Sequence, residues 1–253
     1  MTDHSAMKLG RIRAEADPRV PHLMQIWNPP GMPPSLSMDW YSRVKSFPML
    51  RNDSVGDCTC AAVSHVIQQW TTYTDFEPVV MDDARTIALY SAVSGYVPGN
   101  PATDGGAICA DVLRYWMVTG IDTPDGGPDM LSGFARINPI DTDSLRHAVG
   151  TFGNLYAGIA LPTSAQTEDI WTATDDVPGS WGGHCVPLVG YNAAGPICVT
   201  WGALKQMTWD WWAAYAEEAY ALLSRDWLRA TGTDPAGVDW GALGAAMDVM
   251  RRA

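Results

Sequence analysis

The sequence has little charge and no long uninterrupted apolar run. Only 17% of its 253 residues are charged and 47% are hydrophobic, which excludes disorder over most of the chain. No run approaches the ~20 apolar residues of a membrane-spanning helix, and residues 1–10 lack the apolar stretch of a signal peptide. Basic residues are scarce, with 16 Lys and Arg against 28 Asp and Glu. The net charge of −12 argues against nucleic acid or an anionic membrane as a partner.

Cysteine is also sparse. Five cysteines, an odd number, in a chain of this length without a secretion signal indicate reduced thiols rather than a disulfide framework. We therefore expect a protein that stays in the cytoplasm where it is made. The length suits one large domain or two small ones.

The chain is predicted to have three parts. Residues 1–50 are punctuated by proline and lack sustained periodicity, so we expect an extended N-terminal arm with one short strand within residues 35–48. Residues 51–230 show no break in composition and are predicted to form the main domain. Residues 231–253 are predicted to add a C-terminal helix packed on that domain.

The periodicity of apolar residues changes along the main domain. Three- and four-residue spacings predict helices first, and short apolar runs bounded by Gly, Pro and Asn predict strands after residue 153. This order is typical of an α+β fold with a mostly antiparallel sheet. The expected helices cover residues 58–73, 82–91, 107–118, 141–152, 209–215 and 239–251, and the expected strands cover residues 155–161, 185–191, 197–201 and 218–223.

A cysteine opens the first long helix, in the segment Gly56-Asp57-Cys58-Thr59-Cys60. A thiol in the first helical turn lies near unpaired backbone N–H groups and the positive end of the helix dipole, which lowers its pKa below the free value of ~8.5, whereas the Asp57 carboxylate acts in the opposite direction. Cys58 and Cys60 point about 200° apart, so only one of them can face a cleft. We select Cys58 as the candidate nucleophile and expect Cys60 to be buried.

His184 is the best candidate for a base beside Cys58. It is the first polar residue of an apolar strand and follows two glycines that permit close approach. The other histidines lie in the arm, on a separate helix or along the cysteine helix: His4, His22, His147 and His65. His65 lies seven residues beyond Cys58, or ~10 Å away, too far for a hydrogen bond, so we expect it to be a hydrogen-bonded core residue.

Four segments, in this order, resemble the papain-like cysteine peptidase superfamily, specifically its phage- and bacterium-encoded branch. Residues 52–62 resemble the nucleophile motif, residues 104–121 its "GG…A…Y…GI" helix, residues 183–191 the histidine strand and residues 200–220 the "SWG…WG…GY" ending. The likeness spans about residues 50–223. His184 follows Cys58 by 126 residues (184 − 58), close to the family's ~130 and upward.

The resemblance implies a papain-like fold, in which an N-terminal helical half carrying the nucleophile helix packs on an antiparallel sheet half. It also implies a thiol peptidase or amidase that uses Cys58 and His184 on a peptide or protein substrate, without a cofactor. Asn52 stands where the family has an oxyanion-hole Gln, and is one methylene shorter. Val199 and Thr200 stand where the family has the Asn or Asp that orients the histidine. Thr200 can accept a hydrogen bond, but a neutral hydroxyl supports an imidazolium less than a carboxylate does.

Two other functions fit the same residues. One is a catalytically silent papain-like domain that serves as a structural or interaction protein, for instance as a virion component with phage-particle partners, in which case the protein would be associated with a virion. The other is an acyltransferase or transglutaminase that uses the Cys–His pair on an amine acceptor. A zinc site of Cys58, Cys60, His184 and Cys185 is disfavoured because a C-x-C pair on a helix splays its sulfurs, so no metal is predicted.

Two further expectations concern the arm and the acidic pairs. The N-terminal arm is expected to be a wrapping segment that stays attached, rather than an inhibitory propeptide, because it is short and lacks long helices. The acidic pairs Asp175-Asp176 and Glu217-Glu218 are expected to be exposed, solvating charges.

Overall fold

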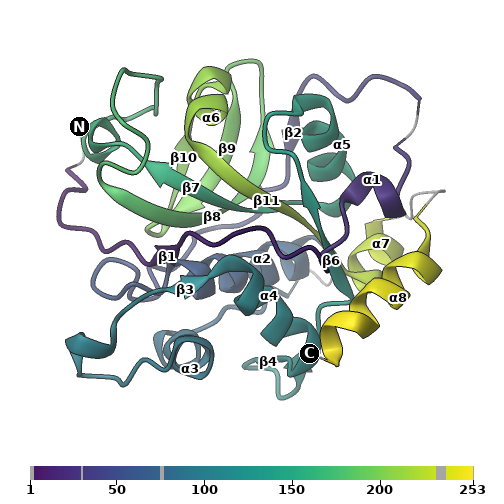
Figure 1. Cartoon of the computed structure of the whole chain (residues 1–253), viewed down its shortest axis with the longest axis horizontal. Coiled ribbons are helices and arrows are strands. Elements are labelled where there is room, and N and C mark those ends of the chain that lie inside the picture. The colour runs from purple at the N-terminus through teal and green to yellow at the C-terminus, as the bar shows by residue number, and fades with distance from the viewer. Residues whose placement is uncertain (1–2, 30, 75–76, 232–237, 253) are drawn as a thin grey trace.

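The computed structural model describes residues 3–29, 31–74, 77–231 and 238–252. Its described part has a helical layer and a sheet layer that face each other (Figure 1). The helical layer consists of α2 (Cys58–Thr74), α3 (Asp83–Ser94) and α4 (Cys109–Val118). The α+β expectation is confirmed, because helices precede a sheet in which every pair of adjacent strands is antiparallel.

The main sheet has the strand order β10-β9-β8-β7-β11-β6, and β2 also pairs with β8. Its central strands carry almost no exposed side chains, since helices cover the sheet. The strands are β2 (Met38–Asp39), β6 (Gly133–Ile137), β7 (Leu155–Leu161), β8 (Gly182–Tyr191), β9 (Pro196–Thr200), β10 (Ala203–Gln206) and β11 (Ala216–Leu223).

Helix α2 is the central element of the core. Nearly all of its residues from Cys58 to Trp70 are buried, because α3 and α4 pack on one side of it and strand β8 on another. Polar contacts also fix it to the sheet layer. The Tyr156 hydroxyl donates to the carbonyl of Thr59 (2.9 Å), and the Trp70 indole donates to the carbonyl of Phe152 (2.9 Å). The start of α2 is therefore hydrogen-bonded to β7 through Tyr156, in addition to the packing of the helix on β8.

Further helices surround these two layers. Helix α5 packs on β7, β8 and β11, α6 packs on β7, and α7 packs on α2 and α5. Helix α8 contacts β6, α4 and the short helix α1 of the N-terminal arm. The bounds of these helices are α1 (Leu23–Ile26), α5 (Thr142–Phe152), α6 (Trp209–Tyr215), α7 (Arg225–Thr231) and α8 (Trp240–Arg251), with 3-10 turns at Pro101–Thr103 and Thr163–Gln166.

The N-terminal arm passes between the helical layer and the sheet layer (Figure 1). Its strand β1 (Arg11–Ile12) pairs in parallel with β3 (Ala107–Ile108), which directly precedes α4. The sequence predicted a helix from residue 107, and this is corrected: residues 107 and 108 are extended because they pair with β1, and α4 begins at Cys109. A second small pair joins β4 (Ile121–Asp122) and β5 (Pro128–Asp129).

Most elements expected from periodicity are present, and the short strand expected within residues 35–48 is β2. The sequence analysis missed β6, β10, α1 and α7. The division into an arm, a main domain and a terminal helix stays a prediction, and residues 232–237 and 253 of the third part lie outside the described residues. Within the described ranges, no helix has the length and apolar character needed to cross a membrane.

Two glycines that end helices offer a matched test of packing beside α2. Gly95 and Gly153 both adopt left-handed backbone angles, with φ of 78° and 84°. A Cβ at Gly153 would lie 2.5 Å from the Trp227 ring, whereas a Cβ at Gly95 would meet nothing within 4 Å. We expect Gly95→Ala to cost about 1 kcal/mol of unfolding free energy from backbone strain, and Gly153→Ala a further 1–3 kcal/mol, roughly, from overpacking. Urea denaturation measures both, and equal losses would contradict this account.

Candidate active site

Cys58 is the first residue of α2 and lies at the boundary between the two layers. The backbone N–H of Gly56, two residues earlier, donates to both carboxylate oxygens of Asp104 (3.0 and 3.2 Å), which fixes the turn that leads into the helix. The Cys58 side chain is close to Cys185 of β8 and to Gly10 of the arm. Only 1% of Cys58 is exposed to solvent.

His184 lies on β8, the strand against which α2 packs. Its Nε2 is 2.8 Å from the Thr200 hydroxyl at the end of β9, and its ring stacks on Trp201 with the centroids 4.8 Å apart. Its other nitrogen, Nδ1, is buried without a hydrogen-bond partner in the described residues. The structure thus brings His184 and Thr200 together, but it contains no hydrogen bond between His184 and Cys58.

Burial keeps both of these side chains neutral. It raises the pKa of Cys58 to about 12, and the backbone groups of Gly10 and Cys185 offset only part of this effect. Burial also lowers the pKa of His184 to about 3. The sequence-based expectation that the helix terminus lowers the pKa of Cys58 is therefore wrong for this conformation, because exclusion of water outweighs the helix dipole.

The N-terminal arm excludes water from this site. Gly10 lies directly against the turn before Cys58, and a Cβ built on it would be 1.7 Å from the carbonyl oxygen of Gly56. A Cβ on Gly106 would be 2.2 Å from the carbonyl oxygen of Gly10, which accepts a hydrogen bond from Ala107 N–H (2.8 Å). On the sheet side, a Cβ on Gly183 would be 2.3 Å from the carbonyl oxygen of Arg11. These glycines let residues 8–12, here called the seam segment, lie between the layers with its backbone over Cys58.

Asn52 lies close to the start of α2, but its amide is already engaged. It is buried, and its Nδ2 donates to Asp57 Oδ1 at 3.2 Å. Asp57 Oδ2 has no hydrogen-bond partner in the described part of the chain. Burial raises the pKa of Asp57 to about 8, despite the hydrogen bond from Asn52. Asp57 therefore lies beside Cys58 largely as a neutral acid at pH 7.

Cys60 and His65 are buried, as the sequence analysis expected. All five cysteines are free and buried: Cys58, Cys60, Cys109, Cys185 and Cys198. His65 is buried within α2, with its Nε2 2.9 Å from the carbonyl oxygen of Pro48, and burial lowers its pKa to about 4. Within residues 3–29, 31–74, 77–231 and 238–252, no group of three or more His, Cys, Asp or Glu side chains is placed to hold a metal ion.

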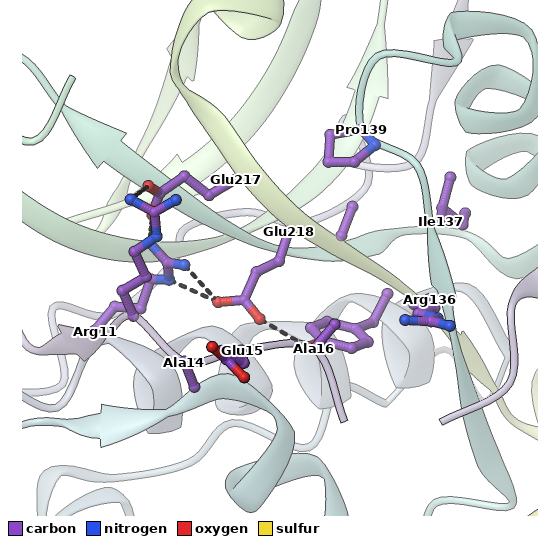
Figure 2. A pocket seen from close by; sticks show the side chains of 12 residues that line it. Arg11, Ala14, Glu15, Ala16, Arg136, Ile137, Pro139, Glu217 and Glu218 are labelled. Atoms are coloured by element: carbon purple, nitrogen blue, oxygen red, sulfur yellow. Dashed lines mark hydrogen bonds and ion pairs between the residues drawn. The ribbon is translucent and has the colours of Figure 1, made fainter. Parts of the chain in front are cut away.

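The sequence analysis missed an ionic cluster beside this site. Glu217 and Glu218 were expected to be exposed, but their side chains are only 20% and 17% exposed because they bind Arg11 of the seam segment. Figure 2 shows the Arg11 guanidinium directed at both carboxylates. No local pattern could reveal this, since more than 200 residues separate Arg11 from either glutamate.

Solved structures of cysteine proteases share this architecture. Xylellain, a cysteine protease from Xylella fastidiosa, matches with a TM-score of 0.66 at 14% identity, over 87% of this chain and 97% of xylellain. Procathepsin L 3 from the larval midgut of Tenebrio molitor matches with a TM-score of 0.62 at 16% identity, over 87% and 77% of the two chains. Procathepsin B S9 from Trypanosoma congolense matches with a TM-score of 0.58 at 13% identity, over 86% and 87%.

These likenesses establish a papain-like fold, as the sequence resemblance implied. No model of a known protein family matches the sequence, and no curated protein matches it. At 13–16% identity the structural neighbours carry the fold alone. The roles of Cys58, His184, Asn52 and Thr200, and the phage or bacterial branch, stay predictions.

The raised pKa of Asp57 predicts a specific dependence of stability on pH. Between about pH 4 and pH 8 the folded chain retains a proton that the unfolded chain loses, so this group stabilises the fold at low pH and the effect is lost as pH rises towards 8. Asp57→Asn, which can still accept from Asn52, removes this dependence. As pH rises through this range, we expect the free energy of unfolding of the wild type, measured in urea, to fall relative to that of Asp57→Asn by about 1 kcal/mol per pH unit.

Asp53→Asn is the matched control for this measurement, because Asp53 is exposed in the same turn. The control variant should follow the pH dependence of the wild type. Parallel curves for wild type and Asp57→Asn would show that Asp57 is ionised in the folded chain.

The cover over Cys58 predicts a change in thiol reactivity. A methyl group on Gly10 cannot fit against Gly56, so Gly10→Ala should displace the seam segment and expose Cys58. We expect iodoacetamide at pH 7 to alkylate Cys58 at least about tenfold faster in this variant, as shown by mass spectrometry of its peptide. Gly31→Ala is the control, since a Cβ there meets nothing within 4 Å. Equal rates in the two variants would mean that the segment does not cover the thiol.

Proposed function

We propose that the chain is a papain-like thiol hydrolase that cleaves a peptide, amide or isopeptide bond. Cys58 is the proposed nucleophile and His184 the proposed base. One observation carries the proposal: a length of extended polypeptide, the seam segment, already lies between the two layers with the Gly10 backbone against Cys58. A groove that accepts the chain's own backbone at a helix-terminal thiol has the dimensions that a peptide substrate needs.

In the proposed reaction, His184 takes the proton of Cys58 and the sulfur attacks the carbonyl carbon of the bond to be cleaved. Nδ1 is the nitrogen available for this step, because Nε2 contacts Thr200. The protonated imidazole then gives its proton to the leaving amine as the C–N bond breaks and a thioester remains. Water that His184 deprotonates attacks the thioester, and the acid product and the free thiol are released.

The developing oxyanion needs hydrogen-bond donors near Cys58. The Cys58 backbone N–H is one, because the first N–H groups of a helix have no partner within the helix. Asn52 is the proposed second donor, and its Nδ2 carries one hydrogen besides the one directed at Asp57. Thr200 is the proposed positioning residue for His184, held 2.8 Å from Nε2.

The described conformation is a latent form in this proposal. With the seam segment in place, substrate cannot reach Cys58, and the pKa values near 12 and 3 oppose proton transfer from Cys58 to His184. Departure of the segment admits water or substrate groups, removes much of the cost of burying charge, and allows a thiolate–imidazolium pair to form. The arm then acts as an attached cover.

A catalytically silent interaction protein is the second candidate function. It is favoured by the complete burial of His184 and by a neutral hydroxyl in the place of the orienting Asn or Asp. Transfer of the acyl group to an amine is a third hypothesis and needs no different residues. A phage or prophage origin, phage-particle partners, and a cytoplasmic or virion location stay predictions from the sequence.

Peptide hydrolysis by the uncovered protein tests the proposal. We expect full-length Gly10→Ala to cleave unfolded proteins or a peptide library, detected as new amino termini, and Cys58→Ser in the same background to abolish the cleavage. Thr200→Val removes the hydroxyl at Nε2 and should lower kcat about tenfold or more, because a mobile imidazole transfers protons less effectively. Thr200→Ser keeps the hydroxyl and should retain most of the rate.

The outcomes separate the three hypotheses. Rapid alkylation of Cys58 in Gly10→Ala without any cleavage would contradict the hydrolase and favour the silent domain. Incorporation of an added primary amine in place of hydrolysis would indicate an acyltransferase.

A further inference from the structure

Arg11 lies in a pocket at the sheet side of the seam. Its side chain is only 2% exposed, and it forms ion pairs with Glu217 and with Glu218, the latter at 2.7 Å from both Nε and Nη2. Tyr220 donates its hydroxyl to the other oxygen of Glu218 at 2.7 Å, so this carboxylate is held in one orientation. Burial alone would lower the pKa of Arg11, but the charges and hydrogen bonds of the two glutamates outweigh it and raise the pKa.

A glycine of β7 leaves room for the Arg11 guanidinium. Gly158 lies in the middle of β7, and a Cβ there would be 2.4 Å from Arg11 Nε and 2.6 Å from Glu218 Oε1. Gly158 has no left-handed backbone angle that would demand glycine. The missing side chain therefore makes space for a flat cationic group over the paired residues Gly158 of β7 and Glu218 of β11. Next to it the pocket opens into a cavity of about 540 Å³ that is also bounded by Arg136, Pro139 and Tyr220 (Figure 2).

The pocket has a fixed relation to the candidate nucleophile. Arg11 directly follows Gly10, whose backbone lies against Cys58. A side chain that takes the place of Arg11 therefore belongs to a residue within about two positions of the bond that Cys58 faces.

Displacement of the seam segment leaves the pocket with a strong chemical preference. Glu217 and Glu218 would remain as two neighbouring negative charges without Arg11, and only Glu217 has a second cationic partner, the largely exposed Arg13 at 3.1 Å. Removal of one partner from a buried ion pair is strongly unfavourable, because the remaining charge is left without compensation. An apolar or acidic side chain in the pocket replaces none of the ion pairs that the two carboxylates make with Arg11, whereas an arginine or lysine replaces them.

We propose that the pocket of Glu217, Glu218 and Gly158 selects a basic side chain of the peptide substrate, and that Arg11 occupies the substrate's place in the latent form. This specificity rests on the proposed hydrolase function, but the binding of a guanidinium group can be measured without any turnover.

Binding to a vacated pocket is the first test. Full-length Arg11→Ala should bind Nα-acetyl-arginine-N-methylamide, seen as a rise in Tm and as heat in calorimetry, and should not bind the norleucine analogue. Adding Glu218→Gln or Gly158→Ala to Arg11→Ala should weaken that binding at least about tenfold. Arg13→Ala is the matched control: Arg13 also pairs with Glu217 at 3.1 Å, but its side chain is 79% exposed, so its removal leaves the pocket filled and should create no binding.

A second variant allows the same test if Arg11→Ala does not fold. If Arg11→Ala does not melt cooperatively, Arg11→Gln keeps the stem and one amide donor and leaves most of the pocket free. Failure of both folded variants to bind the arginine compound, or equal binding of the norleucine analogue, would overturn the proposal.

Substrate preference is the second test. In the Gly10→Ala background, peptides with Arg or Lys near the cleaved bond should be hydrolysed about 100-fold or more faster than peptides with Leu or Glu there, and Glu218→Gln should reduce this ratio. Hydrolysis without a basic preference would overturn the inference and leave the proposed function standing. Binding of the arginine compound without hydrolysis of any peptide would overturn the proposed function and support the pocket.

Discussion

The close backbone contact between the seam segment and the two layers determines the state of the whole site. Gly10 fits against Gly56 and Gly106 on the helical side, and Gly183 receives the carbonyl of Arg11 on the sheet side. None of these approaches leaves space for a Cβ, so the contact depends on glycines from four separate segments of the chain. The burial of Cys58 and the pairing of Arg11 both follow from it.

Burial and ionisation are therefore coupled in this molecule. A thiol at a helix terminus usually has a lowered pKa, yet here the Cys58 thiol and the His184 imidazole are both neutral and share no hydrogen bond. The free energy needed to bury a charged thiolate away from water exceeds the stabilisation that the helix dipole and the backbone groups of Gly10 and Cys185 provide.

The sequence predicted the parts of the site that depend on local pattern. Cys58 at a helix start, His184 near the start of a strand, and Thr200 at the end of the next strand follow from periodicity, turn residues and the family resemblance. The sign of the Cys58 pKa shift could not be predicted, because it depends on where the arm lies. The burial of Glu217 and Glu218 could not be predicted either, since their partner is more than 200 residues away and a pair of adjacent glutamates normally indicates a solvated surface.

In the proposed hydrolase, the attachment of the seam segment to the chain determines how a substrate can enter. A tethered segment competes at an effective concentration in the millimolar range, which a dilute peptide does not match. A substrate can therefore reach Cys58 only when the contacts of the segment are weakened or when its own contacts are better. Gly10 contributes only backbone contacts, among them the hydrogen bond from Ala107 N–H to its carbonyl, which any peptide can reproduce. In the proposed pocket, by contrast, only a chain with a cationic side chain replaces the interactions of Arg11. In the proposed enzyme, recognition of the substrate and release of the cover depend on the same pair of carboxylates, so selectivity for a basic residue and latency follow from one electrostatic arrangement.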